Sequence, residues 1–238
     1  MKALICIPTY NERENISPLV EAIFSNVPDN AEVLVIDDNS PDGTGQIADE
    51  LAAKNPRVNV LHRASKDGLA AAYVAGFKWA LDRDYDWIFE MDADFSHDPK
   101  FLPLFFETIQ THKWNSVCGS RYVPGGGVSN WSRSRLLLSR LGSLYASFWL
   151  GWKVRDWTGG FNSWSKETLK AINLDDIKSR GYCFQIEMKF RCLDTGNALK
   201  EVPFTFQERR EGHSKMSGDI VSEALVGVAN LRLRDRQY

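Results

Sequence analysis

The fold of this chain is decided by the stretch Trp87-Ile88-Phe89-Glu90-Met91-Asp92-Ala93-Asp94. Its largely apolar beginning predicts a buried strand, and two aspartates one residue apart follow where that strand ends. The carboxylates of Asp92 and Asp94 are hard oxygen ligands of the kind that Mg²⁺ or Mn²⁺ prefers, and the phosphates of a diphosphate can complete the shell. The stretch therefore indicates a nucleotide-sugar donor held through a divalent metal. Taken alone, so short a motif is more often two solvated carboxylates in a turn.

Outward from that stretch, strand-like and helix-like segments alternate along the first half of the chain. The alternation predicts an α/β fold with a mostly parallel central sheet, covered by helices on both faces, in which ligands bind at the carboxyl ends of the strands. Polar loops follow the predicted strands and are expected to meet in one crevice, although turn chemistry alone explains any single loop. The predicted strands are residues 3–7, 32–36, 58–61, 87–91 and 116–119, and the predicted helices are residues 17–27, 44–55, 68–81 and 100–111.

Composition limits the classes of protein to which the chain can belong. Its 238 residues, 43% of them hydrophobic, suffice for one large domain or a domain with an appendage, and they argue against disorder. The formal net charge of −2 does not suggest a nucleic-acid partner. The first residues lack the apolar stretch of a signal peptide, and the cysteines form no CxxC pair, so we expect buried reduced thiols and a cytosolic setting. The cysteines are Cys6, Cys118, Cys183 and Cys192.

A basic segment without acidic residues lies in the middle of the chain. No Asp or Glu occurs between Arg121 and Arg155, and six basic residues lie there, so the segment attracts anions. Within it, Arg135, Ser139 and Ser143 recur every four residues, while apolar residues share another face of a predicted helix near 133–152. These apolar residues are Leu137, Leu141, Leu144 and Phe148, with Trp149 and Trp152 adding aromatic surface.

The length of this helix decides how it can meet a membrane. Residues 136–152 number 17, which gives a helix of about 25 Å, shorter than the hydrocarbon core of about 30 Å. Arg140 also interrupts the run, so we expect the helix to lie in the membrane interface rather than to span the bilayer. An ordinary buried helix is the alternative. No apolar stretch of 18 or more residues exists in the sequence, which therefore predicts no transmembrane span.

Two further segments complete the chain. Residues 209–215 form a polar loop with a central glycine, and this loop is either a lid that closes over a diphosphate or a solvated charge run. Residues 216–238 are predicted to form an amphipathic tail whose basic end rests on anionic lipid. Its apolar face consists of Ile220, Ala224, Leu225 and Val228, and its basic end consists of Arg232, Arg234 and Arg236.

A series of motifs runs along residues 5–215. They read PTYNEREN from Pro8, VIDDNSPDGT from Val35, MDADFSH from Met91, GSRY from Gly119, DWTGGF from Asp156, GYCFQIE from Gly181, and Glu208-Arg209 through Ser214-Lys215. In this order they resemble the family 2 glycosyltransferases, in particular the dolichyl- or polyprenyl-phosphate mannose synthases. The resemblance implies a Rossmann-like GT-A nucleotide-sugar-binding domain over residues 1–215, including the interface helix near 133–152, with the tail 216–238 after it.

The same resemblance implies roles for individual residues. Those around the nucleotide sugar are Pro8, Tyr10, Glu12, Ile36, Asp38, Asp92, Ala93, Arg209 and Lys215. Those at the acceptor phosphate are Arg121, Arg135 and Ser139, those at the metal are Asp92, Asp94 and Ser96, and those assigned to catalysis are Asp92, Asp94, Arg121, Arg209 and Lys215. Asp38 is expected to accept a base N–H. Where relatives carry Gln this chain has Ser96, a shorter and neutral ligand, and where they read Gly-Leu-Gly it reads Gly68-Leu69-Ala70.

The implied reaction is the inverting transfer of mannose from GDP-mannose to a polyprenyl or dolichyl monophosphate. A lipid monophosphate already carries an anionic oxygen near neutral pH, so no general base is required, and His97 is expected to have a structural role. The resemblance and the helix pattern together imply a peripheral protein at the cytoplasmic face of a membrane, with a membrane-anchoring partner protein as an option. The alternatives are a polyprenyl-phosphate glucose synthase that uses a UDP-sugar, and a catalytically silent nucleotide-binding membrane adaptor.

Overall fold

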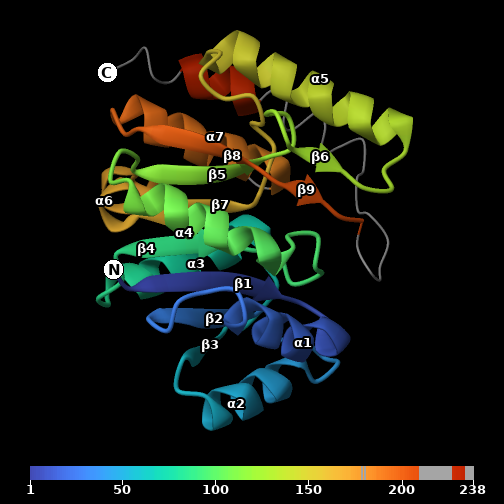
Figure 1. The fold of residues 1–238 in the computed structure, drawn as a ribbon, viewed down its shortest axis with the longest axis vertical. Coiled ribbons are helices and arrows are strands. Elements are labelled where there is room, and N and C mark those ends of the chain that lie inside the picture. Colours follow the sequence, from blue (N-terminus) through green and yellow to red (C-terminus); the bar gives the residue numbers. More distant parts are fainter. Residues whose placement is uncertain (178, 180, 209–226, 234–238) are drawn as a thin grey trace.

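In the computed structural model, residues 1–177, 179, 181–208 and 227–233 are described, and within them a seven-stranded sheet has the order β3-β2-β1-β4-β7-β5-β8 (Figure 1). A separate pair of short strands, β6 and β9, lies near one end of this sheet. The strands are β1 Ala3–Thr9, β2 Ala31–Asp37, β3 Val58–His62, β4 Trp87–Glu90, β5 Ser116–Ser120, β6 Gly127–Val128, β7 Asn162–Ser165, β8 Leu199–Pro203 and β9 Thr205–Phe206.

The predicted α/β fold with a mostly parallel sheet is confirmed. β1 pairs in parallel with both β2 and β4, β2 pairs in parallel with β3, and β5 pairs in parallel with β8. Each of the predicted strands overlaps an observed one. The strand β7 departs from the prediction, since it runs antiparallel to both of its neighbours, β4 and β5. Because of this direction, the loop before β7, residues 156–161, lies at the same edge of the sheet at which β4 and β5 end.

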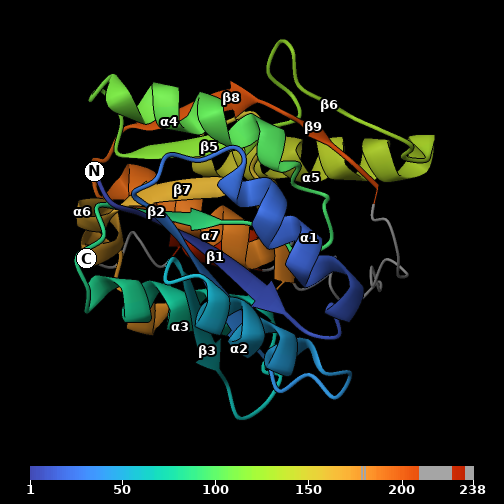
Figure 2. The ribbon, with the colours of Figure 1, turned by 60° about the horizontal axis from the view of Figure 1, so that its bottom comes forward.

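Helices cover both faces of the sheet. Figure 2 shows α4 on one side and α3 on the other, with the strands between them. The first face is packed by α1, α2 and α4, and the second by α3, α6 and α7. The helices are α1 Arg13–Phe24, α2 Thr44–Lys54, α3 Leu69–Leu81, α4 Leu102–Gln110, α5 Arg133–Leu150, α6 Lys166–Ala171 and α7 Gly181–Asp194, with the 3₁₀ turns η1 Pro99–Phe101 and η2 Leu174–Asp176.

The first helix begins earlier than the predicted residue 17. The carbonyl of Glu12 accepts hydrogen bonds from the backbone N–H groups of Asn15 and Ile16, so α1 starts at Arg13 and Pro18 lies inside it. The helix predicted at residues 100–111 is divided into η1 and α4. Asp98 caps η1 through a bond from the Lys100 N–H at 3.0 Å, and Pro99 occupies its first turn. The helices therefore start where the loops at the carboxyl edge of the sheet end.

Helix α5 lies beyond the edge strand β8 and covers the end of the sheet (Figure 1). It corresponds to the helix predicted near 133–152, and Gly151 ends it with a φ of 107°, a conformation that favours glycine. Its inner side packs with α7 and with the helical residues 227–233 in a small cluster that includes Ala146, Ile186 and Val228. Among the described helices, none is both long enough and apolar enough to cross a bilayer.

Helix α5 has its polar side against the protein and its apolar side exposed, which is the reverse of a surface helix on a soluble domain. Ser143 is buried and Ser139 is half-buried, so the predicted polar stripe faces the protein. The opposite, apolar face is exposed, with Phe148 at 73% and Trp152, just past the helix end, at 71%. An ordinary buried helix, the alternative interpretation, is therefore wrong. The exposed apolar residues of α5 are Leu137, Leu138, Leu141, Leu144 and Phe148.

The tail prediction is tested only in part. Val228, assigned to the apolar face of the tail, is 1% exposed and packs in the cluster between α5 and α7. Ile220, Ala224, Leu225, Arg234 and Arg236 lie outside the described residues. All four cysteines are buried and free, which confirms the prediction of reduced thiols.

Candidate active site

The loops at the carboxyl ends of β1, β2 and β4 adopt unusual backbone conformations. Asn11, Asn39 and Phe95 have φ angles of 61°, 56° and 61°, in the left-handed region. Asn tolerates this region, but a phenylalanine is uncommon there and its conformation is strained. Phe95 lies between the two candidate metal ligands Asp94 and Ser96. The strain is therefore located where the sequence predicts the donor diphosphate.

Asp38, the predicted acceptor for a base N–H, is paired with an arginine that the sequence analysis did not single out. Oδ1 of Asp38 lies 2.5 Å from Nη1 of Arg63, and both side chains are largely buried. Nη2 of Arg63 also lies 3.3 Å from Oδ2 of Asp67, in the loop before α3. Burial raises the pKa of Asp38 above its ordinary value, and the charge of Arg63 opposes this effect only in part.

The remaining predicted nucleoside residues do not all point toward the loop edge. Nζ of Lys66 lies 3.5 Å from the centre of the Tyr10 ring, which joins the loops after β1 and β3. Glu12 accepts a hydrogen bond from Asn15 at 2.8 Å, and its backbone N–H donates to Thr44. Pro8 is half-buried within β1.

Ile36 occupies a different environment from the other nucleoside residues. Its side chain is fully buried in the core, where its Cδ1 lies against α3 at Gly76. A β-carbon at Gly76 would come within 2.5 Å of that atom, so the Ile36 side chain would have to shift if Gly76 were replaced. The side chain of Ile36 therefore does not reach the site, and its carbonyl accepts from the Thr9 hydroxyl at 3.4 Å.

Asp92 is oriented by two groups from different elements. The hydroxyl of Tyr73, on α3, donates to Oδ1 of Asp92 at 3.3 Å. Burial, together with the charges of Asp92 and Glu90, raises the pKa of Tyr73 well above its ordinary value, so this side chain remains a hydroxyl donor. The backbone N–H of Asp92 donates to Nδ1 of His97 at 3.0 Å.

His97 has the structural position that the sequence analysis expected. Because Nδ1 accepts a backbone N–H, the ring proton of neutral His97 lies on Nε2, which is 3.9 Å from Oδ2 of Asp92. The ring is 1% exposed and stacks on Phe161 at a centroid distance of 4.9 Å. His97 thus supports the loop that carries Asp92 and Asp94 from the side of the protein core.

This loop offers oxygen atoms of the kind that a divalent cation prefers. Oδ1 of Asp94 accepts from the backbone N–H of Ser96 at 3.0 Å, while the buried Oγ of Ser96 has no hydrogen-bond partner among the described residues. Within the same part of the chain, no group of three or more His, Cys, Asp or Glu side chains can hold a metal. Two carboxylates and a hydroxyl leave coordination positions for the oxygens of a diphosphate, which is the usual arrangement for Mg²⁺.

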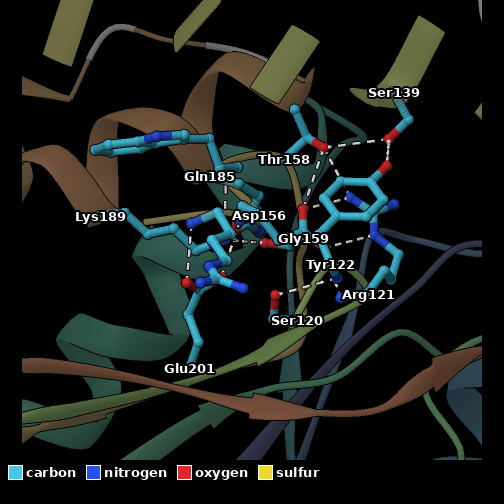
Figure 3. A network of polar contacts seen from close by, with 12 residues as sticks. Ser120, Arg121, Tyr122, Ser139, Asp156, Thr158, Gly159, Gln185, Lys189 and Glu201 are labelled. Carbon is cyan, nitrogen blue, oxygen red and sulfur yellow. Dashed lines mark hydrogen bonds and ion pairs between the residues drawn. The ribbon is translucent and has the colours of Figure 1, made fainter. Parts of the chain in front are cut away.

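Arg121 is held in a bidentate ion pair. Its Nε and Nη2 donate to the two carboxylate oxygens of Asp156 at 2.7 and 2.6 Å, and its backbone N–H donates to the same carboxylate at 2.9 Å (Figure 3). Burial would raise the pKa of Asp156, but the charge and hydrogen bonds of Arg121, with help from Lys189, outweigh burial and hold the pKa below its ordinary value. The pair is therefore ionised and fixes the end of β5 to the loop before β7.

The predicted acceptor residues converge through this pair. Nη2 of Arg121 also donates to the Thr158 hydroxyl at 2.7 Å, which lies 3.4 Å from Oγ of Ser139 on α5. Ser139 accepts from the Tyr122 hydroxyl at 2.8 Å, as Figure 3 shows. The structure thus brings Arg121 and Ser139 together.

Trp131 connects Arg135 with Arg121. Its ring centre is 4.2 Å from the guanidinium carbon of Arg135 and 5.4 Å from that of Arg121. Nη1 of Arg135 lies 3.6 Å from Oε1 of Glu208. Two guanidinium groups and the amino-terminal end of α5 therefore gather at one place, where Asp156 and Glu208 pair with the two guanidiniums.

Phe206, in β9, places the acceptor cluster beside the aspartate loop. Its ring centre is 5.2 Å from that of Trp131 and 5.8 Å from that of His97. The next residue, Gln207, donates its backbone N–H to the carbonyl of Ser96 at 3.2 Å. Phe206 and Gln207 therefore join the loop of Asp92, Asp94 and Ser96 to the cluster around Trp131. No sequence motif singled out Phe206.

A buried polar network behind the site was also missed. Glu90, fully buried, accepts hydrogen bonds from Trp164 and Gln185, each at 2.6 Å. Burial raises its pKa to about 7, although both hydrogen bonds and the charge of Lys189 oppose this. The signal available in the sequence was the pair Gln185 and Lys189, four residues apart and therefore on one face of a predicted helix. Two predicted site residues, Arg209 and Lys215, and the proposed lid 209–215 lie outside the described residues.

Comparison with known proteins identifies the family. The family model described as Glycosyl transferase family 2 matches residues 4–172. The chain belongs to this family. It is 50% identical over 236 residues to the undecaprenyl-phosphate mannosyltransferase of Micrococcus luteus, an alignment that covers 99% of this chain and 96% of that protein. It is 47% identical over 236 residues to the polyprenol monophosphomannose synthase of Mycolicibacterium smegmatis, covering 99% and 88%.

Solved structures support the same fold. The glucosyl-3-phosphoglycerate synthase of Mycobacterium tuberculosis in complex with Mn²⁺, UDP-glucose and phosphoglyceric acid gives a TM-score of 0.71 at 19% identity, covering 95% of this chain and 79% of that one. Its complex with Mg²⁺ and UDP gives a TM-score of 0.65 at 19% identity, covering 98% and 79%. At such identity the likeness shows the fold alone, and it confirms the predicted GT-A architecture. This family 2 chain is a glycosyltransferase.

Proposed function

We propose that this glycosyltransferase transfers mannose from GDP-mannose to a polyprenyl monophosphate and forms a β-linked polyprenyl-phosphate mannose. The observation that carries the proposal is the contact of Phe206 with both His97 and Trp131, since it joins the aspartate loop to the arginine cluster. A donor diphosphate and an anionic acceptor are then bound side by side, as a displacement between them requires. The two curated relatives named after mannosyl transfer to polyprenyl lipids, at 50% and 47% identity, support this choice of substrates.

The donor side is assigned to the loops after β1, β2 and β4. Asp38 accepts the base N–H groups, and Asp92, Asp94 and Ser96 hold Mg²⁺ or Mn²⁺ against the diphosphate. When bound, the cation supplies positive charge that stabilises the leaving diphosphate. Tyr73 and His97 keep Asp92 in place during the reaction, through its carboxylate and its backbone N–H respectively. Arg209 and Lys215 are assigned to the diphosphate by family resemblance.

The acceptor side is assigned to Arg121, Arg135 and Ser139. An oxygen of the lipid phosphate attacks the anomeric carbon of the sugar, the new carbon–oxygen bond forms on one face, and the bond to the diphosphate breaks on the other. The configuration at that carbon is therefore inverted. No proton has to be removed from the nucleophile, because the phosphate is already anionic near neutral pH. The work of the protein is to orient the two phosphorus-bearing substrates.

The membrane is the source of the acceptor. The exposed apolar face of α5 carries Leu141, Leu144 and Phe148, and the exposed cations Arg133 and Arg140 lie on the same helix. Apolar and aromatic side chains enter the acyl boundary, while the cations contact anionic headgroups. We assign this chain a peripheral position at the cytoplasmic face of a membrane, with α5 in the interface and with an anchoring partner protein as an addition.

The nucleotide of the donor distinguishes the proposed function from a second candidate function. The solved structures of similar fold contain UDP or UDP-glucose, so a polyprenyl-phosphate glucose synthase remains the alternative. The relatives with 50% and 47% identity over 236 residues favour mannose. The retained metal ligands argue against a silent adaptor.

The decisive experiment is transfer of radiolabelled mannose from GDP-mannose to a polyprenyl phosphate in detergent or vesicles, with UDP-glucose in parallel. We expect a lipid product that mild acid hydrolyses. Asp94→Asn should abolish transfer with its unfolding midpoint kept, because it removes charge from a loop and not volume from the core. The matched control is the exposed Asp84→Asn, which should keep full activity. Transfer from UDP-glucose alone, or an active Asp94→Asn protein at saturating Mn²⁺, contradicts the proposal.

A further inference from the structure

Lys189 is a fully buried lysine on α7 that the reaction described above does not use. Its ammonium donates to the carbonyl oxygens of Asp156 at 2.8 Å, Trp157 at 3.3 Å and Gly159 at 2.7 Å. An ammonium has three N–H donors, and burying it costs several kcal/mol unless these are satisfied. All of the N–H donors of Lys189 therefore bind one loop, residues 156–159, which lies between α5 and β7.

Two other elements hold the same loop from different sides. The carboxylate of Glu201, on β8, accepts from the backbone N–H groups of Arg155 at 2.8 Å and Asp156 at 2.9 Å. The carboxylate of Asp156 is clamped by Arg121. Figure 3 shows Lys189, Glu201 and Arg121 arranged around this loop. A short segment without regular secondary structure is therefore fixed at its backbone and at its side chains.

The outer side of the loop faces the acceptor residues. Thr158 accepts from Arg121 at 2.7 Å and lies 3.4 Å from Oγ of Ser139. Lys189 binds the backbone on the inner side, one residue before and one residue after Thr158. The position of the Thr158 hydroxyl, and with it the orientation of Arg121 and Ser139, is consequently set by a side chain that touches neither substrate.

We propose that Lys189 is a positioning residue for the acceptor phosphate, acting through the loop 156–159 on Arg121 and Ser139. The inference rests on the proposed function, because it takes these residues as the acceptor site. A merely structural lysine would balance the charge of Asp156 and stabilise the fold, without any effect specific to one substrate. The two roles differ in which kinetic constant changes when the ammonium is removed.

The test compares Lys189→Met and Lys189→Gln with the wild-type protein and with Lys170→Met, an exposed lysine on α6. Farnesyl phosphate serves as the acceptor and GDP-mannose as the donor. Lys189→Met should raise the KM for farnesyl phosphate about tenfold, as expected for lost orientation of the phosphate ligands. Calorimetry should give an unchanged affinity for GDP-mannose. Lys189→Gln should restore part of the loss, because its amide keeps N–H donors for the loop carbonyls.

A further variant reports on the loop itself. Thr158→Val removes the hydroxyl between Arg121 and Ser139 at nearly constant volume, and it should raise the KM for farnesyl phosphate in the same direction. The proposal is overturned if the Lys189 variants lower the unfolding midpoint but leave this KM unchanged, or if they weaken GDP-mannose as strongly as the acceptor. If Lys189→Met does not fold, Lys189→Gln and Thr158→Val decide the question.

The failure of this inference is distinguishable from failure of the proposed function. If the wild-type protein transfers no mannose, the proposed function is wrong, and calorimetric binding of farnesyl phosphate then replaces KM as the measurement. If the wild-type protein transfers mannose and the Lys189 variants match the Lys170→Met control, only the positioning role is wrong.

Discussion

The hydroxyl of Tyr73, on α3, donates a hydrogen bond to Oδ1 of Asp92 across 3.3 Å, and so links a helix on one face of the sheet to the candidate metal loop. A carboxylate that binds a metal with one oxygen depends on such outer partners for its orientation, and their loss typically costs 10- to 100-fold in metal affinity.

Tyr73→Phe should therefore raise the Mn²⁺ concentration needed for half-maximal transfer by about tenfold, as expected for loss of a partner behind a metal ligand. Tyr85→Phe is the matched control, because Tyr85 also loses a hydroxyl bonded to a carboxylate, that of Glu32 at 2.6 Å, away from the site. The Mn²⁺ titration of both variants checks this. An identical Mn²⁺ dependence in the two proteins contradicts a supporting role for Tyr73.

Asp38→Ala should weaken GDP-mannose by on the order of 1–3 kcal/mol, since a buried acceptor for base N–H groups is lost and Arg63 is left without its closest partner. UDP-glucose should bind more weakly than GDP-mannose to the wild-type protein. Calorimetry with both nucleotides measures the difference. The assignment of Asp38 fails if the variant binds GDP-mannose as tightly as the wild-type protein does.

Arg135→Ala should lower turnover with the lipid acceptor by about 10²-fold, or about 2.7 kcal/mol, with little change in donor affinity. The guanidinium stacks on Trp131, so Arg135→Lys should restore charge without the planar fork and rescue only in part. Arg83→Ala, an exposed arginine just after α3, is the control. Weaker GDP-mannose binding with an unchanged acceptor dependence would instead assign Arg135 to the donor diphosphate.

Glu90 should make stability depend on pH in the metal-free protein. Burial raises its pKa from 4.5 to about 7, so the folded state favours the protonated form. The wild-type protein then loses stability as pH rises through this window, while Glu90→Gln does not. Between pH 4.5 and 7, the free energy of unfolding of Glu90→Gln should increase relative to that of the wild type by up to about 3 kcal/mol. Above pH 7 the difference between the two proteins should stay constant. Denaturant titrations at pH 4.5, 6 and 8 test this, and a constant difference excludes a raised pKa.

The apolar face of α5 should control binding to vesicles. Replacing Phe148 and Trp152, which are 73% and 71% exposed, by serine should weaken binding to phosphatidylglycerol vesicles by more than about tenfold, because both rings lose their burial in the interface. Leu69→Ser, an exposed leucine on α3, is the control. Transfer to farnesyl phosphate in solution should not change. Equal vesicle binding by all three proteins shows that α5 does not contact the membrane.

The first half of the fold was predictable because local patterns determine it. The run before Asp92 and the apolar segments around it have the lengths and spacings of buried strands and their connecting helices. The antiparallel strand β7 was not predictable in this way, since Asn162-Ser163-Trp164-Ser165 is too polar to read as a central strand, and its direction depends on pairing with two distant neighbours. The sequence shows a polar and an apolar stripe on α5, but only the packing of the helix shows which stripe points inward.

The candidate site was predictable where a short motif carries the chemistry, and not where partners come from distant elements. Asp38 could be singled out, but its partner Arg63 is separated from it by 25 residues and carries no motif of its own. Arg121 was expected to contact a phosphate, whereas the structure shows that it first binds Asp156, which is 35 residues away. Long-range pairs of this kind follow from topology, which a single sequence does not reveal.

The opposite orientations of Ser139 and Phe148 on α5 have a consequence for the choice of lipid. If the outer face of the helix enters the bilayer while its inner face meets the phosphate, the prenyl chain remains in its hydrocarbon surroundings throughout the reaction. Extracting such a chain would cost about 0.8 kcal/mol for each methylene group exposed to water. An enzyme that leaves the chain in place avoids this cost, and it also has no means of measuring the chain. Acceptors of very different length should therefore compete on nearly equal terms, with the phosphate alone deciding which lipid is used.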